Sequence, residues 1–208
     1  MLVVNSHTRA WAPADNPAMN RRAVLALGLA VAAGCAAARP ITYRFDPSHS
    51  FVHFEVMHFG TATLRGRFGP LDGLATLDRR AGTGQVSLSV PTQAVSTGLA
   101  VLDSRLREDD LLDSSAHPQA YFVAERFVFD GEALREVRGE FTLRGNSRPL
   151  TLRAQRFACG THPVVQRPWC GGDFEAELRR SDYGLTFGLP LVADRVRLLI
   201  QVEAIQAP

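Results

Sequence analysis

The chain has 208 residues, enough for one domain with an additional terminal segment. Hydrophobic residues make up 46% of the chain and charged residues 21%, which is ordinary for a globular protein. The formal net charge is only +2, and no basic stripe is interleaved with aromatic residues, which argues against nucleic acid as a partner.

An export signal is predicted near the N-terminus. Arg21 and Arg22 precede the apolar run 23–34, which is shorter than the roughly 20 residues of a membrane-spanning helix. A positive start followed by a short apolar core is typical of a signal peptide. The paired arginines and Leu25 also fit the twin-arginine route, although the usual Ser, Phe and Lys of that motif are missing, so this route and ordinary secretion both stay open.

The end of this segment fits two kinds of processing. Residues 36–38 are alanines and suit simple cleavage, whereas the residues before Cys35 resemble a lipobox, in which Cys35 would be lipidated. The polar residues before Met19 do not suit a signal peptide, so we expect translation to begin at Met19. We assign residues 1–38 to an extension and signal peptide, and residues 39–208 to one periplasmic or secreted domain.

Most of the remaining chain alternates between apolar and polar side chains, which is typical of strands with one apolar and one solvent-facing side. The segment 121–129 is an exception, because both of its faces are apolar and its orientation stays open. The pattern predicts an all-β fold, an antiparallel barrel of about eight strands, since closure removes exposed sheet edges. The positions expected to face inward are Val52, Phe54, Val56, His58, Leu64, Phe68, Val86, Leu88, Val90, Phe141, Leu143, Leu150, Leu152, Phe174, Ala176, Leu178, Leu198, Ile200, Val202 and Ala204.

One stretch, residues 95–113, spaces its leucines near the helical period instead. Ser96 or Thr97 is placed to cap a helix there. We therefore predict a helix, or two helical turns, that closes one end of the barrel.

Three histidines, His49, His53 and His58, lie close together in the sequence, as metal ligands often do. On a strand, His49 and His53 are about 13 Å apart, and His58 falls on the opposite face from His53. One zinc ion, with bonds of about 2 Å, cannot bridge such positions, so we predict no metal site. His58 is then a lone polar group on the inward face, either a hydrogen-bonded structural histidine or a ligand contact.

Two cysteines, Cys159 and Cys170, flank a short loop that contains Pro163 and Pro168. A disulfide at the tip of a hairpin fits this spacing, and the oxidising compartment reached by export favours it. Free thiols, or a metal pair completed by His162, are the alternatives.

Motifs of the common catalytic machineries are missing from the sequence, which has no Gly-x-Ser-x-Gly elbow, His-Glu-x-x-His pair or phosphate-binding loop. Asp109, Asp110 and Asp113 lie near Arg105 and Arg107, where they indicate a solvated, salt-bridged surface. We therefore predict that the protein is not an enzyme and has neither catalytic residues nor a cofactor.

A series of short motifs follows along residues 41–206. The motifs are Tyr43-x-Phe45-Asp46-x-x-His49-Ser50, Thr63-x-x-Gly66-x-Phe68, Leu102-Asp103-x-x-Leu106-Arg107, His117-Pro118-x-Ala120-x-Phe122, Val137-x-Gly139-x-Phe141, Arg180-Ser181-Asp182-Tyr183-Gly184 and Val192-x-Asp194-x-Val196. Each motif is weak alone, but their order is specific. In this order the chain resembles the YceI-like family of small secreted bacterial proteins.

The resemblance implies a lipocalin-like barrel that binds a polyisoprenoid or another isoprenoid-tailed lipid, such as a quinone. We therefore expect non-catalytic binding, sequestration or transport of such a lipid, with a quinone-using redox accessory and a stress-response scaffold as alternatives. The residues expected to contact the tail are Phe54, Val56, Phe68, Val86, Leu88, Val90, Leu106, Phe141 and Leu143. His58, Asp103 and Arg107 are expected to meet its polar end.

One departure concerns the head group, since many family members carry Arg and His where this chain has Leu102 and Arg105. Head-group preference is therefore expected to depend on Asp103 and Arg107, which persist. Beyond the lipid, the further partners considered are a membrane, reached through a lipidated Cys35, and a second copy of the chain in a homodimer.

Overall fold

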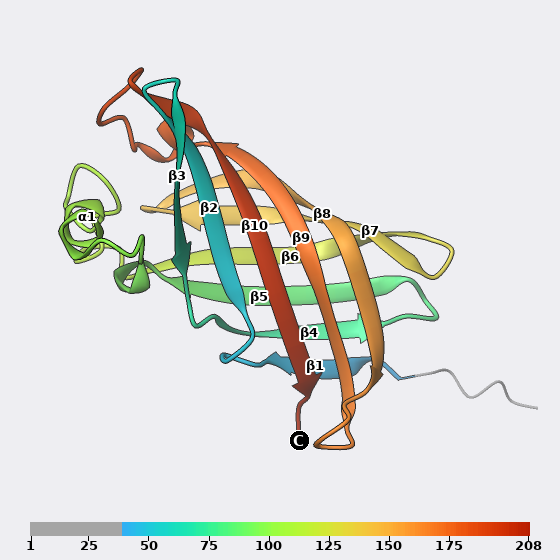
Figure 1. The fold of residues 1–208 in the computed structure, drawn as a ribbon. Helices are drawn as coiled ribbons and strands as arrows, with labels where there is room; N and C mark the ends of the chain where they lie inside the picture. The colour runs from blue at the N-terminus through green and yellow to red at the C-terminus, as the bar shows by residue number, and fades with distance from the viewer. Residues whose placement is uncertain (1–38) are drawn as a thin grey trace, which may run out of the picture. The chain divides into compact units, whose positions relative to one another are not determined.

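The computed structural model describes residues 39–208, so the predicted signal peptide, the start at Met19 and the alternative fates of Cys35 lie outside the described residues. Strands make up most of the described part (Figure 1). The elements are β1 Ile41–Phe45, β2 Phe51–His58, β3 Ala62–Phe68, β4 Asp72–Asp78, β5 Thr83–Pro91, η1 Thr92–Ala94, α1 Ala100–Leu106, β6 Gln119–Asp130, β7 Ala133–Leu143, β8 Asn146–Thr161, β9 Pro168–Arg179, η2 Arg180–Tyr183 and β10 Val192–Gln206. No helix of this part is long and apolar enough to cross a membrane.

The strands form a closed antiparallel barrel. Neighbouring strands run β1-β4-β5-β6-β7-β8-β9-β10, and β1 then pairs with the end of β10, which closes a ring of 8 strands. β10 is long enough to pair with β2 as well, nearer its beginning. The hairpin of β2 and β3 therefore extends the wall at one end of the ring. The predicted all-β barrel of about eight strands is confirmed.

The inward faces follow the predicted alternation. Phe54, Leu88, Leu152 and Ile200, for example, are all buried. They belong to one apolar core cluster that takes side chains from most of the strands. This side of the wall is the one that surrounds the interior of the barrel.

The ambiguous segment 121–129 contains a β-bulge. Phe122 and Ala124 are buried, and the pairing of β6 with β7 then shifts register between Ala124 and Arg126. A bulge adds one unpaired residue, so the face that points inward changes from even to odd positions. Phe127 accordingly packs against the core. The even positions are thus buried in the first half of the strand and the odd positions pack inward in the second half, whereas the apolar Tyr121 and Val123 are about half exposed.

The helical stretch is shorter than the range 95–113. α1 has 7 residues, and its N-cap is Leu99, without a side-chain cap. The predicted cap at Ser96 or Thr97 is therefore wrong. Gly98 has a φ of 80°, a left-handed conformation that separates these residues from the helix. The alternative of two helical turns matches the structure.

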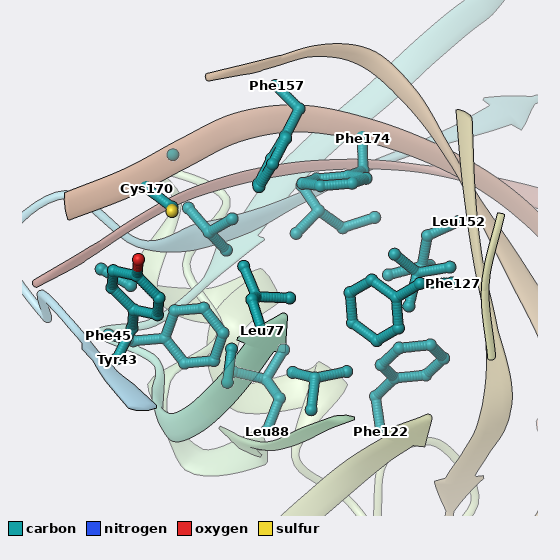
Figure 2. Close-up of a pocket in the computed structure, with 17 residues that line it drawn as sticks. Tyr43, Phe45, Leu77, Leu88, Phe122, Phe127, Leu152, Phe157, Cys170 and Phe174 are labelled. Carbon is teal, nitrogen blue, oxygen red and sulfur yellow. The ribbon is translucent and has the colours of Figure 1, made fainter. Parts of the chain in front are cut away.

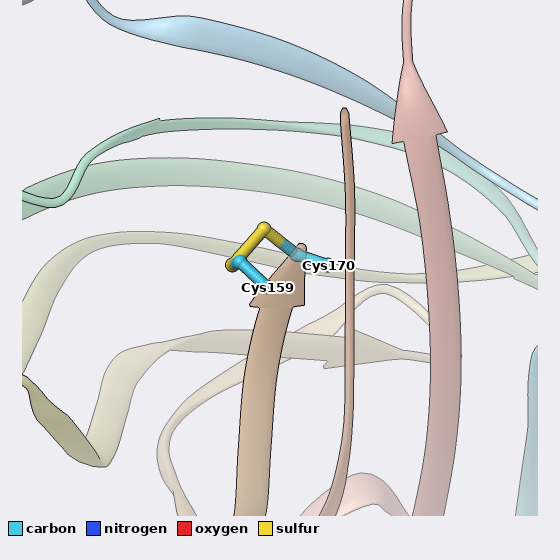
Figure 3. The surroundings of a disulfide bond; sticks show 2 residues. All are labelled: Cys159 and Cys170. Carbon is cyan, nitrogen blue, oxygen red and sulfur yellow. A yellow bond between two sulfur atoms is a disulfide. The ribbon is translucent and has the colours of Figure 1, made fainter. Parts of the chain in front are cut away.

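The predicted disulfide is present between Cys159 and Cys170 (Figure 3). The two cysteines face each other directly in the register of β8 and β9. The bond thus joins neighbouring strands beside the loop that connects them.

Candidate functional site

The barrel encloses a cavity of about 330 Å³, which we call the upper chamber. Its walls come from the barrel strands, and α1 covers it with Leu102, Arg105 and Leu106. Apart from His58, Thr92, Arg105 and Arg180, all of its lining residues are apolar. Such a lining suits a hydrocarbon and offers a polar ligand few partners.

Most of the predicted ligand-binding residues meet in this chamber. Those that line it are Phe54, Val56, His58, Phe68, Leu88, Val90, Leu106, Phe141 and Leu143. Val86 lies on the same wall as Leu88 but lines a separate, smaller cavity. Strand alternation could identify the positions on strands because it fixes which side of each strand faces the interior, whereas Leu106 belongs to α1.

Asp103 and Arg107 were expected at the polar end of the ligand, but neither is among the residues that line the chamber. The Asp103 carboxylate accepts hydrogen bonds from Thr97 N (2.6 Å) and Thr97 Oγ1 (2.7 Å). These hydrogen bonds hold the pKa of Asp103 below its usual value. Arg107 donates from Nε to the carbonyl of Gln93 and from Nη2 to that of Val95. Both side chains therefore hold the loop between β5 and α1 in place.

We expect Arg107→Ala to lower the free energy of unfolding by about 1–2 kcal/mol, because two backbone carbonyls lose a charged donor. Lipid occupancy is expected to stay unchanged, since the side chain lies outside the chamber lining. Urea unfolding and mass spectrometry of solvent extracts measure the two effects. Loss of the lipid without loss of stability would instead restore Arg107 as a head-group contact.

Three of the four polar lining residues gather at one end of the upper chamber, which we call the mouth. His58 is the last residue of β2, Arg105 belongs to α1, and Arg180 begins η2. The His58 ring also packs against that of Phe59, with ring centroids 4.0 Å apart and the planes tilted by 44°. A ligand with one polar end would place that end here and its apolar part deeper in the barrel.

At the mouth, Arg105 joins α1 to the loop 184–191. Its guanidinium lies 4.3 Å from the centroid of the Phe187 ring, a cation–π contact. It also donates two hydrogen bonds to the Asp110 carboxylate, of 2.5 Å and 2.6 Å. These hydrogen bonds raise the pKa of Arg105 and lower that of Asp110. Phe187 is 54% exposed although it lines the chamber, so it lies at the boundary between the cavity and solvent.

The loop 184–191 is held from inside by Arg180, whose side chain is 7% exposed. Its Nε donates to the carbonyl of Ala193, and its Nη2 donates to that of Val192. Its Nη1 donates to the carbonyls of Leu185 (2.7 Å) and Phe187 (2.8 Å). Burial lowers the pKa of this guanidinium, whereas the charge of Asp194 opposes that effect. The hydrogen bonds replace the water that the buried cation loses.

A smaller cavity of about 70 Å³, the lower chamber, lies toward the other end of the barrel (Figure 2). Tyr43 and Phe45 of β1, together with Cys170 of the disulfide, line part of it. Four residues line both chambers: Leu88, Phe122, Leu152 and Ile200. These four side chains lie where the two spaces adjoin.

Within residues 39–208, no three His, Cys, Asp or Glu side chains lie close enough together to hold a metal ion. His49 instead pairs with Asp46, at 2.7 Å between Nδ1 and Oδ2. This hydrogen bond raises the pKa of His49 and lowers that of Asp46.

Sequence reasoning did not assign Arg105, Arg180 and Phe187 to the site. Arginine is rarely buried, so its charge predicts that Arg180 lies at the surface, although it follows two positions after the inward-facing Leu178. Phe187 belongs to a loop, where periodicity carries no information about side-chain direction. A motif containing Arg180 was visible in the sequence, but the role of its arginine was not.

Three comparisons extend these observations. The model of the YceI-like domain matches residues 43–204. The protein YceI of Escherichia coli O157:H7 is 32% identical over 183 residues, which cover 86% of this chain and 93% of that protein. BcnA of Burkholderia cenocepacia has a similar fold, with a TM-score of 0.66 and 18% identity over 76% of this chain and 98% of its own. A polyisoprenoid binding domain from Saccharophagus degradans, implicated in plant cell wall breakdown, gives a TM-score of 0.58 and 18% identity over 80% and 99% of the two chains.

Proposed function

The chain belongs to the YceI-like domain family, and from this premise we propose that it binds an isoprenoid-tailed lipid, a polyisoprenoid or a quinone, in the upper chamber. The observation that carries the proposal is the largely apolar cavity of about 330 Å³ in the barrel. The similar fold described as a polyisoprenoid binding domain gives further support.

The expected driving force is the hydrophobic effect. Each Å² of apolar surface that the tail removes from water contributes about 25 cal/mol. Rings and branched aliphatic chains such as Phe54, Phe68 and Leu198 surround the space. An isoprenoid, which is itself branched and unsaturated, fits such an irregular wall through many weak contacts.

We infer that the polar end of the ligand stays at the mouth, near His58 and Arg105. Arg105 has hydrogen-bond donors, and its Nε is not among the atoms that bind Asp110. A quinone carbonyl or a phosphate can accept such a hydrogen bond. His58, the last residue of β2, offers a second polar group at the mouth.

The role we propose is sequestration or transport, without a bond made or broken. No Asp, Glu or Cys is among the residues that line the upper chamber. The proposed setting is the periplasm or the outside of the cell, reached through the signal segment predicted before residue 39. We also propose that a lipidated Cys35 anchors the protein to a membrane and that two copies associate.

The direct test is to purify the protein from its native host and to extract it with organic solvent. Mass spectrometry of the extract is expected to reveal an isoprenoid-tailed lipid in near-equal amount to the protein. Protein that is always empty, or that carries only straight-chain fatty acids, would contradict the proposal.

A matched pair of variants links the lipid to the chamber. Ala120 lines the upper chamber and is 2% exposed, whereas Val123 on the same strand is 50% exposed. Ala120→Phe is expected to reduce co-purified lipid at least tenfold, because the added ring occupies the space of the tail. Val123→Phe adds bulk outside the barrel and is expected to leave the lipid unchanged. Equal lipid content in both variants would place the ligand elsewhere.

A further inference from the structure

We propose that four side chains lying across the barrel set the length of isoprenoid tail that the protein can bury; this inference rests on the proposed lipid binding. The four are Leu88, Phe122, Leu152 and Ile200, which line both chambers. We call them the dividing layer. A tail that enters from the mouth meets this layer with its far end. If the tail is longer than the upper chamber, its remaining carbon atoms therefore stay outside the barrel.

The dividing layer is built from several walls of the barrel. Leu88 of β5 and Phe122 of β6 are direct neighbours in the sheet. Leu152 comes from β8 and Ile200 from β10. All four are buried, with Phe122 at 3% and Leu152 at 9% exposed. Contacts from different walls therefore hold the layer in place.

Phe122 is the largest member of the layer, and the backbone makes room for its ring. At Gly139 of β7, an added Cβ would lie 2.9 Å from Cζ of Phe122. Because glycine has no Cβ, the ring can lie against this strand. Figure 2 shows Phe122 beside Phe127 and Leu152 at one side of the lower chamber.

The depth of the upper chamber gives the expected tail length. Ile200 pairs with Val52, and six residues further along β2 lies His58 at the mouth. Six steps of about 3.3 Å, on a strand tilted by about 40°, correspond to about 15 Å along the barrel. An extended isoprene unit, with four carbon–carbon bonds, spans about 5 Å. The upper chamber therefore accommodates about three units.

The lower chamber is the space that the layer keeps from the tail. Its volume of about 70 Å³ is small beside the 330 Å³ above it. Together with the space freed by removal of the Phe122 ring, it would admit about one further isoprene unit.

The first measurement compares geraniol, farnesol, geranylgeraniol and geranylfarnesol on the delipidated protein, by displacement of a fluorescent apolar probe. Affinity is expected to rise about tenfold per isoprene unit as far as farnesol. Beyond farnesol it is expected to stay level, because further units remain in water. A steady rise through geranylfarnesol would overturn the length limit but not lipid binding.

The second measurement uses two variants on β6. Phe122 belongs to the dividing layer, whereas Phe127 lines the lower chamber alone. Phe122→Ala is expected to bind geranylgeraniol about tenfold more tightly than farnesol. Phe127→Ala is an equal truncation below the layer. This variant is expected to bind farnesol and geranylgeraniol with equal affinity, as the unaltered protein does. Equal responses in the two variants would overturn the role of the layer.

Where Phe122→Ala does not fold, a second pair makes the same comparison. Leu152 belongs to the layer and Leu77 lines the lower chamber alone, and both are buried. Leu152→Ala is expected to extend the preferred tail, and Leu77→Ala is not. If no prenol binds the unaltered protein, the proposed function itself fails. This result differs from an affinity that keeps rising beyond farnesol, which would overturn only the length limit.

Discussion

Replacing Arg180 with alanine is expected to lower the free energy of unfolding by about 4 kcal/mol. The guanidinium serves four backbone carbonyls, which belong to Leu185, Phe187, Val192 and Ala193. Leaving buried acceptors unpaired costs more than the hydrogen bonds gain. Arg180→Lys is expected to recover little of this stability, because one ammonium group cannot reach four carbonyls that lie around the planar guanidinium. Urea unfolding followed by circular dichroism measures both changes.

The neighbouring residue supplies the control for this effect. Arg179 pairs with Asp194, at 3.0 Å, but its side chain is 72% exposed. Arg179→Ala is expected to change stability little, because exposed ion pairs are screened by water and salt. If both alanine variants unfold at the same urea concentration, the account of Arg180 as the support of loop 184–191 is incorrect.

Opening the Cys159–Cys170 bond is expected to cost about 3 kcal/mol, since the bond closes a short loop in the unfolded chain. The two cysteines are 11 positions apart in the sequence. In a domain of this size, such a loss lowers Tm by about 10 °C. Thermal unfolding with and without dithiothreitol measures the change, because the reductant opens the bond in the unaltered protein.

The double variant Cys159→Ser, Cys170→Ser is the control for other effects of the reductant. It is expected to unfold at the temperature of the reduced protein and to show no response to dithiothreitol. A protein that is indifferent to reduction would show that the pairing of β8 with β9 already supplies the restraint.

The barrel was predictable because alternation is a local property that the sequence displays directly. Strands such as β2 and β10 have one apolar face along their length, so their orientation follows from the residues alone. β6 was not predictable in this way, since the bulge after Ala124 exchanges its faces. Ring closure between β1 and β10 joins the two ends of the domain, and no periodicity within either strand indicates that pairing.

The residues of the candidate site also fall into a group that the sequence could predict and a group that it could not. Lining residues on strands, such as Val56 and Phe141, could be assigned because they repeat with the strand period. On the segment between β5 and β6 only Leu106 was assigned correctly, because Asp103 and Arg107 form hydrogen bonds within that segment instead. Arg180 was missed because its charge predicts exposure, whereas the carbonyls of the loop 184–191 satisfy it inside the protein.

The pairing of β10 with both β1 and β2 also bears on the order of events during synthesis. Tyr43 pairs with Ala75 of β4 on one side and with Gln206 of β10 on the other, so the second edge of β1 has no partner until β10 has been made. Until then the nascent chain is an open sheet with unpaired edges, which are prone to associate with other chains. Contacts between such distant segments also slow folding. A ribosome-bound chain arrested before β10 is therefore expected to remain sensitive to protease and to depend on chaperones.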